Sequence, residues 1–224
     1  MKKIIPIEID KDSKGTVAKA WVVIACIAML LLLLVRNPWI WIPLLILLLF
    51  TAFFVLWFHR IPERATAEGD ESTVTSVADG KVVIVDRVYE GEFFKGDCIQ
   101  VSVYMDFFDV HANFWPMTGE ISYYKYHPGK YLLAFLPKSS EKNEHSSTAI
   151  RNSRGEIFFK QIAGTFARRI VCYSEEGMKV ERGEQCGIIK FGSRIDIYLP
   201  LDAEILVREG EHTKAKITPI ARLR

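Results

Sequence analysis

Two long apolar runs near the start of the chain limit what it can fold into. The first covers about residues 18–35 and the second residues 39–58, with only the sequence RNP between them. A helix needs about 20 apolar residues to cross a bilayer, and neither run has the polar face of a helix that packs on a soluble core. The pattern predicts an N-terminal membrane hairpin of two helices over residues 1–59. A second long run directly after the first argues against a cleaved signal peptide.

Basic residues flank this hairpin where the chain enters and leaves it. The first span is preceded by Lys2, Lys3, Lys11, Lys14 and Lys19. The second span is followed by Arg60 and Arg64, and the connection contains only Arg36. Positively charged flanks favour the cytoplasmic side of a membrane. The sequence therefore predicts a protein of the cell membrane whose remaining residues, 60–224, form a domain on the cytoplasmic side.

Residues 60–224 are enough for one domain with its own core, and they have the pattern of short strands. Apolar and polar residues alternate in CIQVSVYM (98–105), GEISYYKY (119–126) and RIDIYLP (194–200). A weak repeat, EGEFFKGDCI, EGMKVERGEQC and EGEHTKAKIT, places glycine turns between such runs, as in barrel-sandwich folds. We expect a mainly β, barrel-sandwich-like domain after the membrane hairpin.

Composition and spacing argue against several classes of function. A formal net charge of +2 gives no strongly basic surface, so we expect no nucleic-acid partner. The four cysteines lack CxxC spacing, and no phosphate-binding or dinucleotide glycine loop is present. Asp109 and His111, with His127 or His145, could offer metal ligands, but the HExxH spacing is missing. We expect no metal.

The stretch GIIKFGSRIDIYLP, residues 187–200, places a small nucleophile between two strand-like runs. Gly192 has no Cβ to hinder attack on its own carbonyl group, and Ser193 follows it directly. This arrangement suits chemistry at the peptide bond between them. Gly-Ser pairs also occur in ordinary turns, so the dipeptide alone does not decide between the two.

Six stretches of the chain follow one another in an order and spacing found in one enzyme family. They are SVADGKV (76–82), DVHANFWPMTG (109–119), HPGKYLLAFLPKSSEKNEH (127–145), QIAGTFARRIV (161–171), GEQCGIIKFGSR (183–194) and FGSRIDIYLP (191–200). Together they resemble the phosphatidylserine decarboxylases, in their short membrane-anchored form, over roughly residues 60–220. Six co-linear motifs are far more specific than any one of them.

The resemblance implies a chain that cuts itself. Ser193 Oγ would attack the Gly192 carbonyl, and elimination and hydrolysis would follow. A β chain, 1–192, would then stay associated with an α chain, 193–224, whose first residue is a pyruvoyl group. The ketone of this covalent cofactor would form a Schiff base with a substrate amine and take up the electrons of the lost carboxylate. The implied reaction converts phosphatidylserine in the bilayer to phosphatidylethanolamine and carbon dioxide.

Two further residues are expected to assist Ser193. On a strand, Asp109 and His111 would share a face, a spacing suited to an imidazole supported by a carboxylate. The resemblance favours His111 as the base that activates Ser193. Asp79, in VADG, matches the family's aspartate and would orient the base, although Asp-Gly is also a common hairpin turn. The longer bacterial form has a second histidine three positions after the first, where this chain has Phe114.

Aromatic and basic side chains near these positions are candidates for lipid binding. The aromatic and apolar ones could line a lipid-facing wall or belong to the core: Phe107, Phe108, Phe114, Trp115 and Met117. The basic ones could receive a phosphate or carboxylate, or be solvated: Lys138, Lys142, Arg168 and Arg169.

Two other functions compete with self-processing decarboxylation. One is a non-catalytic, membrane-tethered β module that binds or scaffolds, and the other is a metal-dependent hydrolase on a related β fold. The presence of Gly192, Ser193, His111 and Asp79 together argues against a module that has lost its activity.

Overall fold

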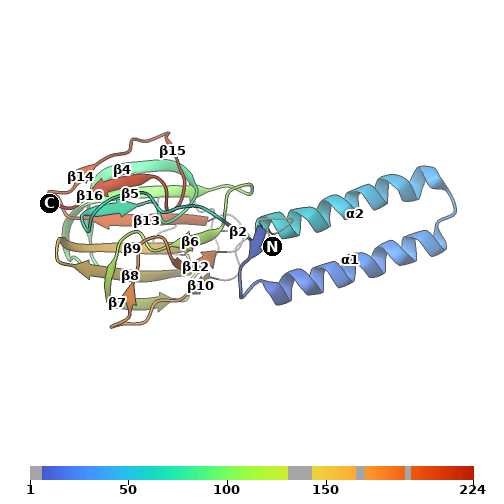
Figure 1. The fold of residues 1–224 in the computed structure, drawn as a ribbon, viewed down its shortest axis with the longest axis horizontal. Helices are drawn as coiled ribbons and strands as arrows, with labels where there is room; N and C mark the ends of the chain where they lie inside the picture. Colours follow the sequence, from blue (N-terminus) through green and yellow to red (C-terminus); the bar gives the residue numbers. More distant parts are fainter. Residues whose placement is uncertain (1–6, 131–142, 165–169, 190–192) are drawn as a thin grey trace. The chain divides into compact units, whose positions relative to one another are not determined.

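The chain divides into two compact units, Met1–Glu63 and Arg64–Arg224. A computed structural model describes residues 7–130, 143–164, 170–189 and 193–224 (Figure 1). The first unit contains the helices α1 (Lys14–Leu34) and α2 (Pro38–Phe58) and two short antiparallel strands, β1 (Ile7–Ile9) and β2 (Arg60–Pro62). Asn37 starts α2 because its side-chain oxygen accepts a hydrogen bond from the N–H of Trp39 at 3.0 Å.

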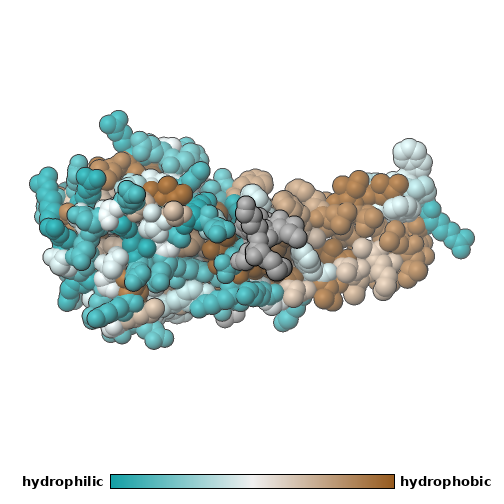
Figure 2. All heavy atoms as spheres, in the orientation of Figure 1, coloured by the Kyte–Doolittle hydropathy of each residue, from teal (hydrophilic) through white to brown (hydrophobic). Residues whose placement is uncertain are grey.

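Both helices are long and apolar enough to cross a membrane. Each has 21 residues and a mean hydropathy of 2.6, and at 1.5 Å per residue each is about 30 Å long. Their apolar side chains face outward along the length of the hairpin (Figure 2), and Leu34 is 76% exposed. Exposure of such a surface to water would be unfavourable, whereas exposure to lipid would not. The predicted pair of apolar helices is confirmed, and α1 begins four residues before the predicted span.

The second unit is built from antiparallel sheets, which confirms the mainly β prediction. Its largest sheet has eight strands in the order β11-β7-β8-β9-β13-β5-β4-β15 and curls into a half-barrel. These strands are β4 (Gly80–Glu90), β5 (Gly96–Met105), β7 (Gly119–His127), β8 (His145–Asn152), β9 (Gly155–Ala163), β11 (Lys179–Val180), β13 (Ser193–Leu199) and β15 (His212–Thr213).

Two three-stranded sheets complete the unit, in the orders β10-β12-β6 and β14-β16-β3. Their strands are β3 (Thr73–Thr75), β6 (Ala112–Phe114), β10 (Ile170–Cys172), β12 (Gln185–Ile189), β14 (Glu204–Ile205) and β16 (Pro219–Arg222). Apolar side chains on one face of the large sheet form the main core, among them Val101, Val103, Ile195, Ile197 and Phe159. Each such burial contributes about 1.5–3 kcal/mol to folding.

The opposite face of the large sheet is also covered. The tip of the β4–β5 hairpin packs on it, and Phe93 stacks on Phe158 with ring centroids 5.3 Å apart. Nearby, the fully buried Arg194 and Asp196 form an ion pair, with Nε and Oδ1 2.8 Å apart. Ser102 of the neighbouring strand donates to the same Oδ1 at 2.6 Å. A slip of β13 by one residue would move this pair into the apolar core, so the pair fixes the register.

Candidate active site

The strand register gathers candidate residues at one end of the eight-stranded sheet. Ser193 begins β13, where it pairs with Met105 at the end of β5 and with Ala163 at the end of β9. β4 pairs antiparallel with β5, so its first residue, Gly80, lies at this end too. Asp79 directly precedes Gly80 and is therefore placed near the start of β13.

His111 is tied to the strand that leads into Ser193. It directly precedes β6, whose Ala112 pairs with Ile188 of β12. The carbonyl oxygen of His111 accepts a hydrogen bond from the N–H of Ile189 at 3.2 Å. β12 ends at Ile189, and β13 begins at Ser193. Gly192 lies between them, outside the described residues.

The hydroxyl group of Ser193 is buried and contacts the thioether of Met105. The residue is 0% exposed, and its Oγ lies 3.9 Å from the Sδ of Met105. A thioether sulfur is a weak acceptor, so this contact orients the hydroxyl without engaging it strongly. A buried position also keeps bulk water away from any reactive group formed at residue 193.

The ring of His111 has a defined tautomer. Its Nδ1 lies 3.0 Å from the backbone carbonyl oxygen of Asp109. A carbonyl oxygen can only accept, so Nδ1 carries the hydrogen and Nε2 holds the basic lone pair of the neutral ring. The sequence predicted that the Asp109 carboxylate would support the imidazole. The backbone of Asp109 does so instead, because its carboxylate turns back to accept from the N–H of Asp106 at 2.9 Å.

The carboxylate of Asp79 has two fixed partners and influences a second carboxyl group near His111, that of Asp109. The Asp79 carboxylate forms a two-point ion pair with Arg64, at 2.5 and 2.7 Å, and accepts from the N–H of Ala215 at 2.9 Å. Burial raises the pKa of the nearby Asp109 carboxyl, and the negative charges of Asp106 and Asp79 raise it further. Arg64 and the backbone of Ala215 thus hold the Asp79 carboxylate in place, and its negative charge acts on the Asp109 carboxyl. Its role in orienting the base stays a prediction.

Sequence reasoning missed a chain of buried polar side chains beside Ser193. Ser146 donates to the Oε1 of Gln161 at 2.9 Å, and the Nε2 of Gln161 donates to the Oδ1 of Asn113 at 2.8 Å. This order directs the amide nitrogen of Asn113 to the Met105 sulfur, 3.8 Å away, which Ser193 also contacts. All of these side chains are 0% exposed. In the sequence, only the alternation of His111 and Asn113 in DVHAN pointed to this chain of polar side chains.

The candidate lipid-binding residues separate into two groups. Three belong to the core, since Phe114, Trp115 and Met117 are at most 2% exposed, whereas Phe107 and Phe108 are 41% and 69% exposed. The position of the family's second histidine is therefore a core position in this chain. Four basic candidates lie outside the described residues: Lys138, Lys142, Arg168 and Arg169.

Comparison with known proteins assigns this chain to a family. The family model described as phosphatidylserine decarboxylase matches residues 50–220. The chain belongs to the phosphatidylserine decarboxylase family. Three relatives named phosphatidylserine decarboxylase proenzyme support this. The one from Amoebophilus asiaticus is 47% identical over 171 residues, 76% of each chain. That from Syntrophus aciditrophicus is 45% identical over 75% of this chain and 78% of its own. That from Prosthecochloris aestuarii is 40% identical over 88% of this chain and 90% of its own.

Membership of the phosphatidylserine decarboxylase family makes the chain a carboxy-lyase and disfavours both the non-catalytic module and the metal-dependent hydrolase. The word proenzyme in the relatives' names agrees with the predicted self-processing.

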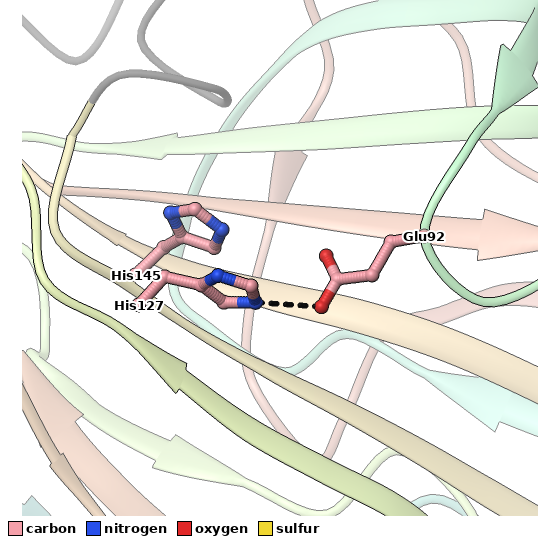
Figure 3. Close-up of side chains that lie close together, drawn as sticks. All are labelled: Glu92, His127 and His145. Carbon is pink, nitrogen blue, oxygen red and sulfur yellow. Dashed lines mark hydrogen bonds and ion pairs between the residues drawn. The ribbon is translucent and has the colours of Figure 1, made fainter.

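This phosphatidylserine decarboxylase family member also has a cluster of two histidines and a glutamate on the outer face of the sheet. Glu92, His127 and His145 bring their ligand atoms within 4.8 Å of one another (Figure 3). The rings of His127 and His145 are stacked at 4.3 Å with planes only 14° apart, so their in-plane lone pairs do not converge on one point. Lys160 already lies 2.9 Å from Glu92 Oε2. This geometry suits an ion-pair cluster better than a metal site.

The cluster fastens the tip of the β4–β5 hairpin to β7, β8 and β9. Glu92 accepts from His127 at 2.6 Å, and from Tyr123 and Ser147 at 3.1 Å each. Burial alone would raise the pKa of the Glu92 carboxyl, but Lys160 and His127 outweigh burial and hold it at about 2. Burial also lowers the pKa of His145, which favours its neutral ring.

A pH-dependent loss of stability is expected for Glu92→Gln. The pKa of Glu92 lies below the ordinary 4.5, so its ionised form stabilises the fold above about pH 5, and this stabilisation is lost as the pH falls toward 2. The substitution should lower the free energy of unfolding by about 2 kcal/mol at pH 7 and by less than half as much at pH 3. Thermal unfolding of the full chain in detergent measures both values.

Asp97→Asn is the matched control for this experiment. Asp97 and its partner Arg87 are 48% and 65% exposed, so its loss should cost less than about 0.5 kcal/mol at either pH. An equal deficit for Glu92→Gln at both pH values would contradict the assigned charge.

Proposed function

We propose that this chain cleaves itself between Gly192 and Ser193 and then decarboxylates phosphatidylserine to phosphatidylethanolamine with the pyruvoyl group formed at residue 193. The observation that carries the proposal is the placement of Ser193. It is a fully buried serine at the first position of a central strand, in a chain of this family. Its hydroxyl contacts the Met105 sulfur that Asn113 also contacts, and the preceding strand β12 is hydrogen-bonded to His111.

In the proposed cleavage, His111 Nε2 accepts the proton of Ser193 Oγ as the oxygen attacks the Gly192 carbonyl. The C–N bond breaks, the nitrogen takes up the proton, and an ester joins the two residues. Removal of the Cα hydrogen of residue 193 then expels the Gly192 carboxylate from Cβ. The enamine left behind is hydrolysed to a ketone and ammonia. A positioned base typically contributes about 10²–10⁴-fold to such proton transfers.

The surroundings of residue 193 fit the group that these steps would produce. A pyruvoyl ketone supplies an electron sink for the bond that loses carbon dioxide. Here it would be enclosed by Met105 and Ala163 and shielded from water, which favours reaction with a bound amine over side reactions. Asn113 would present an amide N–H on the same side.

The two chains would remain one folded unit after cleavage. β13 lies between β5 and β9 and pairs with both along its length. The segment 193–224 also supplies β14, β15 and β16. The apolar hairpin would hold the assembly at the cell membrane, and its basic flanks would keep the catalytic unit on the cytoplasmic side.

The test is the reaction itself. Full-length protein is incubated with vesicles that contain phosphatidylserine labelled in its carboxylate, and the released carbon dioxide and the phosphatidylethanolamine are measured. Equal amounts of both are expected, and hydroxylamine, which captures ketones, should stop their formation. A chain that binds the vesicles and releases no carbon dioxide would instead be the non-catalytic module.

A further inference from the structure

The loop between β5 and β6 exposes two adjacent phenylalanines next to the candidate active site. Phe108 is 69% exposed and Phe107 is 41% exposed, whereas the next aromatic residues along the chain, Phe114 and Trp115, are buried. The pair follows Met105, which contacts Ser193, and precedes His111. We propose that Phe107 and Phe108 insert into the bilayer surface and bring the active-site end of the sheet to its lipid substrate. This inference rests on the proposed function.

The loop is held in one shape by its two aspartates. Asp106 Oδ1 accepts from the N–H of Phe108 at 2.8 Å and from the N–H of Asp109 at 3.3 Å. Asp109 Oδ2 accepts from the N–H of Asp106 at 2.9 Å in return. The phenylalanines are therefore presented by a closed turn, and little conformational entropy remains to be lost when they enter another phase.

These bonds also engage both carboxylates of the loop. Both carboxylates are occupied by backbone N–H groups of the turn, and the pKa of Asp109 is raised, first by its burial. Aromatic rings that enter the headgroup region gain both apolar burial and favourable interfacial contacts.

A membrane surface is the partner that the chain itself indicates. Its two apolar helices, each 21 residues long, place it at a bilayer, so the loop needs no second protein to cover it. A substrate with two acyl chains must also leave the bilayer in part to reach residue 193. A site whose rim enters the lipid shortens that path, whereas a soluble substrate gains nothing from it.

The experiment compares two substrates on one variant. Full-length Phe107→Ser/Phe108→Ser is assayed with long-chain phosphatidylserine in vesicles and with dihexanoyl phosphatidylserine below its micelle concentration. We expect complete self-cleavage, unchanged decarboxylation of the soluble lipid and a loss of about tenfold or more on vesicles. Phe107→Leu/Phe108→Leu, which keeps apolar side chains, should restore most of the vesicle activity.

Tyr89→Ser is the matched control, because Tyr89 is also 69% exposed but lies at the other end of β4. It should leave both activities unchanged. Equal vesicle activity in the serine variant and the wild type would overturn the inference, and so would an equal loss on both substrates or a leucine variant no better than the serine one. If the wild type decarboxylates neither lipid, the proposed function fails instead.

Discussion

Ser193→Ala should yield a single uncut chain of 25.6 kDa with no decarboxylase activity. Without the hydroxyl group no ester can form, and without the ester there is no route to a ketone at residue 193. Wild-type protein should instead separate on a denaturing gel into the chains 1–192 and 193–224. Intact-mass measurement should give an α chain lighter than its sequence by the difference between a serine and a pyruvoyl group.

The control for this variant is Ser146→Ala. Ser146 is also 0% exposed and lies two strands away, but its hydroxyl donates to Gln161 and faces no scissile bond. Complete cleavage is expected for it. Normal cleavage of Ser193→Ala, or active wild-type protein that consists of one uncut chain, would remove the basis of the proposed mechanism.

His111→Gln should slow self-cleavage by about 10²–10⁴-fold, the usual contribution of a positioned base. Glutamine can still donate a hydrogen bond to the Asp109 carbonyl, so the fold around it should persist. It has no lone pair of comparable basicity to accept the proton of Ser193. The rate is measured as the disappearance of precursor after synthesis in a cell-free system, across a range of pH.

His127→Gln separates the effect of this base from that of losing any histidine. His127 belongs to the cluster with Glu92 on the outer face of the sheet, so its loss should affect stability and leave the cleavage rate nearly unchanged. The pH dependence of cleavage should flatten in His111→Gln alone. Equal cleavage rates in His111→Gln and the wild type would assign the base to another group.

Much of the architecture could be predicted because it depends on local patterns. Hydropathy alone located the two helices, and alternation located strands such as β5, β7 and β13 within two residues. Ser193 was predicted to lie between two strand-like runs, and it begins β13. Its role as nucleophile came from the family resemblance and stays a prediction. For Gly192 the prediction concerns a position outside the described residues, and for His111 and Asp79 the catalytic roles remain to be tested.

The parts that escaped prediction depend on contacts between distant segments. Gln161 and Asn113 are 48 positions apart and meet only because β9 and β6 pack together. Glu92 sits in an ordinary glycine-rich turn, and only the curl of the long β4–β5 hairpin brings it to His127. The hydrogen-bond partner of His111 was misassigned because residues 106–111 form a turn between β5 and β6, so the alternation rule for strands does not apply to Asp109 and His111.

The central position of β13 also makes the timing of activation depend on folding. Ser193 acquires its surroundings only when β5 and β9 have paired on either side of it and the ion pair of Arg194 and Asp196 is enclosed. A newly made or damaged chain that has not reached this state keeps an ordinary serine there. Under the proposed mechanism, the ketone would form only in correctly folded molecules, so misfolded chains would have no activity on lipids.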